Sequence, residues 1–126
     1  MPKKCLIVDD NVETVDIVSY ILTKAGYDVL TAENGEMGLR VTQENLPDVI
    51  LLDLMMPVMD GYTMNERLKG DPRTKSIPVI IITAKGGMDP MFEKTKDSPI
   101  PIQGYLVKPF RRQELLELIE TILKPR

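Results

Sequence analysis

Four short apolar runs of this chain are each followed directly by side chains that can carry out chemistry. The residues in these positions are Asp9, Asp10, Asp53, Thr83 and Lys108. If the apolar runs are strands of one parallel sheet, their carboxyl ends lie along the same edge, and ligands bind in the crevice there. Position alone therefore predicts that three carboxylates, a hydroxyl and an ammonium group converge on one site.

A cluster of three carboxylates needs positive partners. Two unit charges about 4 Å apart repel each other by about 4 kcal/mol at an effective dielectric constant of about 20. Lys108 offsets one of these charges, and the oxygen-rich cluster suits magnesium (Mg²⁺), which binds a few carboxylates together with water and phosphate oxygens. The chain has no histidine and one cysteine, which argues against the usual zinc ligand sets and excludes a Ser-His-Asp triad.

A carboxylate that lies beside Mg²⁺ and a lysine has an evident chemical use. It can attack a phosphoryl donor in line while the cations neutralise the oxygens of the group being transferred. The product would be an aspartyl phosphate.

Each of these residues also has a purely structural interpretation. Asp9 or Asp10 can stabilise the amino end of a following helix. Asp53 can end a strand, and Thr83 can belong to a turn. Lys108 can be a solvated side chain whose stem covers apolar surface. Because four strand ends would have to carry complementary groups independently, the shared site is favoured.

The apolar runs have the length and composition of buried strands. Runs that are apolar on both faces are typical of a parallel sheet covered on both sides. Four segments fit this description, 5–8, 49–52, 79–82 and, more weakly, 105–107. Asp28–Ala32 is a weaker fifth candidate, whose mixed character suits an edge strand.

Helical patterns separate these runs. Residues 12–25 carry apolar side chains at helical spacing, with Asn11 as the N-cap and Gly26 as the stop signal. Further helices are predicted over 34–45, 62–69 and 111–123, and a short one over 91–96. The alternation predicts an α/β fold, a doubly wound five-stranded parallel sheet with helices on both faces and right-handed crossovers.

Length and composition favour one ordinary globular domain over residues 1–126. The net charge is only −3, and clustered Lys and Arg with interleaved aromatics are absent, so direct binding of nucleic acid is disfavoured. The apolar run after Lys4 is too short for a secretion signal, and no stretch approaches the ~20 apolar residues of a membrane span. One cysteine excludes an internal disulfide. A cytoplasmic location is therefore expected.

Four motifs resemble those of the receiver domains of two-component response regulators, and the resemblance covers essentially the whole chain. They are Val8-Asp9-Asp10-Asn11, the segment from Asp53 to Gly61, Thr83-Ala84 and Lys108-Pro109-Phe110. Together these motifs are highly specific. We expect a single receiver domain with the flavodoxin-like strand order 2-1-3-4-5.

The resemblance implies a role for each residue of the site. Asp53 is the phosphoacceptor. Mg²⁺ is bound directly by Asp10, by Asp53 and by the Met55 carbonyl, and Asp9 assists.

Other residues would hold the phosphoryl group and respond to it. Lys108 and Thr83 hold its oxygens, and the small Ala84 leaves the phosphoryl site open. The added charge of about −1.5 to −2 draws Thr83 inward, and Tyr105 turns to fill the vacated space, which makes these two the switch residues. The alternative for Tyr105 is an ordinary core residue.

The resemblance also implies partners. A histidine kinase or a phosphotransfer protein supplies the phosphoryl group, and a downstream protein or a missing effector domain receives the signal. The domain is then a regulatory phosphoprotein that assists its own phosphorylation and dephosphorylation. A weak homodimer is a further expectation, through the output face, which is the side formed in family members by the fourth helix, the fifth strand and the fifth helix. The stretch from Thr83 to Lys108 is longer than usual in the family, so the identity of the output partner is not carried over.

Three alternatives remain at this point. A phosphohydrolase with an aspartyl nucleophile would place a second acid two residues after Asp53, where this chain has Met55. An FMN-binding domain would need a phosphate-cradling loop where Asp9 and Asp10 repel phosphate. A degenerate receiver that binds partners without phosphorylation would not need the full set of site residues.

Overall fold

A computed structural model describes residues 2–53, 61–83, 104–108 and 110–124. Its elements are β1 (Lys4–Val8), α1 (Val12–Lys24), β2 (Asp28–Ala32), α2 (Gly35–Asn45), β3 (Val49–Asp53), α3 (Gly61–Lys69), β4 (Val79–Thr83), β5 (Gly104–Val107) and α5 (Arg112–Leu123). The strands form one sheet in the order β2-β1-β3-β4-β5, and every neighbouring pair is parallel. The predicted fold class and strand order are confirmed.

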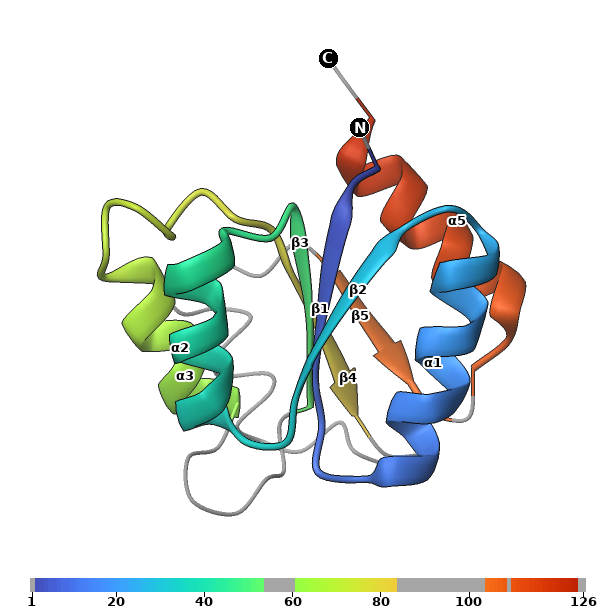
Figure 1. Ribbon diagram of the computed structural model, residues 1–126, viewed down its shortest axis with the longest axis horizontal. Coiled ribbons are helices and arrows are strands. Elements are labelled where there is room, and N and C mark those ends of the chain that lie inside the picture. Colours follow the sequence, from blue (N-terminus) through green and yellow to red (C-terminus); the bar gives the residue numbers. More distant parts are fainter. Residues whose placement is uncertain (1, 54–60, 84–103, 109, 125–126) are drawn as a thin grey trace.

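Helices cover both faces of the sheet, with α2 and α3 on one face and α1 and α5 on the other (Figure 1). The continuous apolar runs are explained by this arrangement, because successive side chains of a strand point to opposite faces. In β1, Leu6 packs in the core cluster that includes Met64 of α3. Its neighbour Ile7 packs in the second cluster, with Val18 of α1 and Leu115 of α5. Both faces of the central strands are therefore buried.

The two edge strands differ from these central ones. Asp28–Ala32 is an edge strand, as its mixed composition predicted. β5 forms the other edge, and Tyr105 and Val107 are 44% and 36% exposed. The interpretation of 105–107 as a strand covered on both faces is therefore wrong, and so is the alternative of Tyr105 as an ordinary core residue. Tyr105 and Val107 lie on the same face of β5, which pairs with β4 alone among the described strands.

The first helix begins and ends where the sequence signals stand. The Asn11 side chain accepts a hydrogen bond of 2.9 Å from the backbone N–H of Thr14, which satisfies one of the unpaired donors at the helix start. After the C-cap, Gly26 has a φ of +96°, a conformation that glycine adopts without steric cost. The short helix predicted over 91–96 lies outside the described residues. Within the described part of the chain, no helix is long and apolar enough to cross a membrane.

Gly38 allows α2 and α3 to approach closely. A Cβ atom at this position would lie 2.8 Å from Cε of Met64 and 3.0 Å from Cγ2 of Val8. Although alanine favours a helix by about 0.8–1.0 kcal/mol over glycine, we expect Gly38→Ala to lower the free energy of unfolding by about 1 kcal/mol, because overpacking costs more. Urea unfolding measures this change. Gly70→Ala is the control, because the nearest atom there is at 3.5 Å. A more stable Gly38→Ala variant would contradict the tight contact.

Candidate functional site

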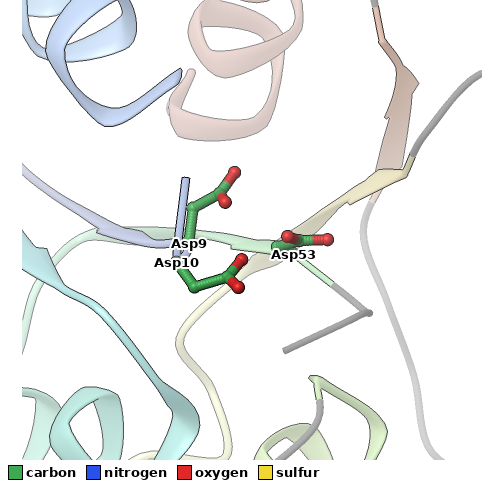
Figure 2. Close-up of side chains that lie close together, drawn as sticks. All are labelled: Asp9, Asp10 and Asp53. Atoms are coloured by element: carbon green, nitrogen blue, oxygen red, sulfur yellow. The ribbon is translucent and has the colours of Figure 1, made fainter. Parts of the chain in front are cut away.

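Three carboxylates meet at the carboxyl ends of β1 and β3. Asp9 and Asp10 follow β1 directly, and Asp53 is the last residue of β3. One carboxylate oxygen from each residue lies within 4.8 Å of those of the other two, and Figure 2 shows the three side chains gathered at this edge. Asp9 and Asp53 are buried, whereas Asp10 is exposed. The sheet thus brings together residues that are 44 positions apart in the sequence.

Asp9 is held by one hydrogen bond to each of its oxygens. Oδ1 accepts from the backbone N–H of Asn11 at 2.9 Å, and Oδ2 accepts from Nζ of Lys108 at 2.9 Å. Its side chain is completely buried, so both bonds offset the cost of removing a carboxylate from water. One oxygen of Asp9 thus accepts from the backbone just before α1 and the other accepts from the lysine, so a structural role at the helix start is compatible with a place in the acid cluster.

Lys108 connects two of the three acids. Besides its bond to Asp9, its Nζ lies 3.9 Å from Oδ2 of Asp53. About a quarter of the lysine side chain is exposed, so its head is engaged with the acids and not simply solvated. Among the described residues of the site, the Lys108 ammonium is the one cation beside three acids, so the charges there favour a further cation.

The donor set fits a hard divalent cation. Mg²⁺ and Ca²⁺ prefer carboxylate, carbonyl and water oxygens, and the described part of the site offers oxygens only. Because both oxygens of Asp9 already accept hydrogen bonds, Asp10 is better placed for direct contact with a metal. A small cavity of about 120 Å³, lined in part by Asp9, Asp10 and Glu33, lies next to these acids.

Two of the remaining predicted site residues, Thr83 and Tyr105, are located by their positions on strands. Thr83 is the last residue of β4 and pairs with Val107, so its backbone lies at the same edge of the sheet. Tyr105 pairs with Ile81, which places it two residues back from that edge. Met55 and Ala84 lie outside the described residues. The structure therefore places Asp9, Asp10, Asp53 and Lys108 in one cluster, with the Thr83 backbone at the same edge.

Sequence reasoning missed a groove beside the site. It has a volume of about 400 Å³ and is lined by Thr14, Ile17, Val18, Ile21, Lys108 and Phe110. On its α1 side, Ile17 is 59% exposed, and the nearby Tyr20 is 64% exposed. The sequence held one sign of this groove, because the apolar Ile17 and Tyr20 do not lie on the buried face of the first helix.

Replacing Asp10 tests the acid cluster through stability. Without metal, Asp10→Asn should unfold at a higher temperature than the wild type, because one source of repulsion between the carboxylates is removed. With Mg²⁺ the order should reverse, since a ligand at one hundred times its dissociation constant adds about 2.7 kcal/mol and the variant loses most of that gain. Thermal unfolding with and without Mg²⁺ measures both effects.

The control for this comparison is Glu13→Gln, which removes an exposed acid from the first turn of α1. It should gain as much stability from Mg²⁺ as the wild type does. An equal Mg²⁺ response in Asp10→Asn would mean that Asp10 is not part of a metal site.

Comparisons with known proteins agree with this geometry. Residues 5–120 match the family model of the response regulator receiver domain. The chain is 40% identical to the DNA-binding dual master transcriptional regulator RpaA of Synechocystis over 98% of this chain and 50% of RpaA. It is 36% identical to the protein PilH of Pseudomonas aeruginosa, over 95% of this chain and 97% of PilH. A crystal structure described as a response regulator of Chloroflexus aurantiacus superposes with a TM-score of 0.89 at 34% identity, covering 99% of this chain and 100% of the other.

These relatives differ in how much lies outside the matched region. The chain spans about half the length of RpaA and of two other transcriptional regulators that it matches, but nearly the whole of PilH. The family model covers most of the sequence, and the relatives at 36–40% identity match along almost its full length. The chain therefore belongs to the response regulator receiver domain family.

Proposed function

We propose that this receiver domain accepts a phosphoryl group on Asp53 in a reaction that depends on Mg²⁺. The observation that carries the proposal is the position of Lys108, whose Nζ lies 3.9 Å from Oδ2 of Asp53 and 2.9 Å from Oδ2 of Asp9. The donor is a histidine kinase or a phosphotransfer protein. The phosphorylated domain changes conformation and controls a partner or an effector domain. Its role is regulatory, and it assists its own phosphorylation and dephosphorylation without acting on external substrates.

The residues of the site divide the work of the transfer. An oxygen of Asp53 attacks phosphorus in line, and the bond from phosphorus to the donor atom breaks. Lys108 pairs with a phosphoryl oxygen while Asp9 keeps its ammonium in place. Asp10, Asp53 and the Met55 carbonyl would hold Mg²⁺, which when bound would help to neutralise the developing charge.

The switch that follows involves residues on β4 and β5. We propose that the Thr83 hydroxyl binds the phosphoryl group, that Ala84 leaves room for it, and that Tyr105 turns inward in response. A phosphoryl group brings a charge of about −1.5 to −2, which gives Thr83 and Lys108 a strong new partner. The exposure of Tyr105 on an edge strand supports this role, because an exposed ring has an inward position still to gain.

The domain boundaries, location and association state belong to the same proposal. Residues 1–126 form one receiver domain, which works in the cytoplasm and does not bind nucleic acid or membranes itself. A weak homodimer forms through the output face, and the exposed Tyr105 and Val107 on β5 supply apolar surface for it.

Intact-mass measurement after incubation with acetyl phosphate tests the proposed function. We expect one added phosphoryl group per chain when Mg²⁺ is present and none when the metal is chelated. A domain that takes up no phosphoryl group, and whose melting temperature does not respond to beryllofluoride with Mg²⁺, would instead be a binding module that works without phosphorylation.

The groove beside Lys108 gives a test for the protein donor. The donor must bring its phosphoryl group to Asp53, and the groove is the apolar surface that adjoins Lys108. We therefore expect Ile17→Glu to slow transfer from a phosphorylated histidine kinase about tenfold or more, because a charge in an apolar contact is costly. Phosphorylation by acetyl phosphate should not change.

The matched control adds the same charge elsewhere on α1. Thr23→Glu changes an exposed residue that does not line the groove, and it should transfer at the wild-type rate. The kinase used should be the one that transfers fastest to the wild type in a purified panel. If Ile17→Glu accepts the phosphoryl group from that kinase as fast as Thr23→Glu does, the donor docks elsewhere.

A further inference from the structure

Asn65 is a buried side chain of α3 whose amide has no hydrogen-bond partner within the described part of the chain. Only 1% of the residue is exposed, and neither Oδ1 nor Nδ2 forms a hydrogen bond in the described structure. Buried polar groups in folded proteins are nearly always hydrogen-bonded, because an unpaired one loses its contacts with water and gains nothing in return. The unpaired amide of Asn65 therefore raises the free energy of the native state relative to a state in which the amide is hydrated.

Lys69 extends the same polar side of α3. It stands four residues after Asn65, so the two side chains lie on one side of the helix. Its Nζ donates to the backbone carbonyls of Ile77 at 2.7 Å and Lys75 at 3.2 Å, and burial lowers the pKa of its ammonium group. One side of this helix of nine residues thus carries a fully buried polar side chain, Asn65, and a partly buried one, Lys69.

Among the described residues, few apolar side chains hold α3 against the core. Met64 and Leu68 are its members of the buried core cluster, and α3 lies beside α2 on its face of the sheet (Figure 1). Near the end of α3, the buried Thr74 hydroxyl donates to the carbonyl of Leu68 at 2.7 Å. The buried Thr74 hydroxyl thus has a hydrogen-bond partner, whereas the buried amide of Asn65 has none in the described structure. The destabilising group in the packing of α3 is therefore Asn65.

We propose that α3 opens locally, as a unit, while the central sheet stays folded, and that the unpartnered amide of Asn65 drives this opening. When α3 leaves the core, the amide regains hydrogen bonds to water, so opening costs less than the loss of Met64 and Leu68 from the core would suggest. Regions that open below the global unfolding free energy are the ones that proteins use in conformational change. The inference does not depend on the proposed phosphoryl chemistry, since its test uses no phosphodonor.

Native-state amide hydrogen exchange on the full chain tests the proposal. In the wild type, the amides of α3 should exchange faster than those of β3, and their rate should not respond to low denaturant. Asn65→Leu removes the amide at similar volume, and it should slow exchange in α3 about tenfold, since one unsatisfied group costs on the order of 1.4 kcal/mol.

Thr74→Val is the matched control, because it also replaces a buried polar side chain by an apolar one but breaks a hydrogen bond that exists. It should speed exchange in α3. Wild-type α3 amides that exchange only at the rate of β3 would overturn the proposal, and this comparison holds even if a variant fails to fold. An Asn65→Leu variant whose α3 exchanges as fast as the wild type, or faster, would overturn it too, because the amide would then be satisfied in the native state.

Discussion

An Asp53→Asn variant is expected to take up no phosphoryl group from acetyl phosphate with Mg²⁺, whereas the wild type takes up one per chain. Asparagine keeps the size and shape of the side chain but removes the anionic oxygen that attacks phosphorus. The variant should still fold, because Lys108 keeps its closer bond of 2.9 Å to Asp9. Intact mass measures the uptake, and circular dichroism checks the fold.

The control for this variant is Asp16→Asn. Asp16 is an exposed acid on α1 outside the acid cluster. Its replacement therefore tests whether the loss of a carboxylate elsewhere on the domain also prevents phosphorylation. It should be phosphorylated as the wild type is. If Asp53→Asn takes up as much phosphoryl group as the wild type, the phosphoacceptor is another residue.

Replacing Lys108 by methionine is expected to affect both phosphorylation and stability. The rate of phosphorylation by acetyl phosphate should fall about 10²- to 10³-fold, because a cation aimed at the developing charge is lost. Breaking a buried ion pair costs about 3–5 kcal/mol. Since Lys108 is 26% exposed and Asp9 keeps its bond to Asn11, we expect a loss of about 2 kcal/mol after solvent screening.

A second substitution separates these two effects. In the double variant Asp9→Asn, Lys108→Met, the buried carboxylate is neutral, so most of the lost stability should return in urea unfolding. Phosphorylation should remain slow, because the Lys108 ammonium near Asp53 is still missing. A single Lys108→Met variant as stable as the wild type would show that the Asp9 contact does not hold the site together.

The central sheet and the acid cluster could be predicted from the sequence because their signals are local. A strand buried on both faces must be apolar at every position, as in 49–52, and no other element of that length needs this pattern. The convergence of Asp9, Asp10 and Asp53 then followed from the rule that parallel strands end at one edge.

Features that depend on tertiary neighbours could not be predicted in this way. Tyr105 is 44% exposed on β5, which is an edge strand of the described sheet, and its own sequence does not reveal that position. Asn65 looks like a surface residue of a short helix, yet it is buried. The Lys108 ammonium lies closer to Asp9, at 2.9 Å, than to Asp53, at 3.9 Å. This difference depends on side-chain conformations, which cannot be predicted from the spacing of residues in the sequence.

Locating the phosphoryl group on the chain tests the central claim most directly. Borohydride reduces an aspartyl phosphate to homoserine, so the modified residue can be read by peptide mass spectrometry after treatment with acetyl phosphate and Mg²⁺. We expect homoserine at position 53 and nowhere else. Homoserine at position 9 or 10, or phosphate found on a hydroxyl side chain, would contradict the account in which Asp53 is the phosphoacceptor beside Lys108.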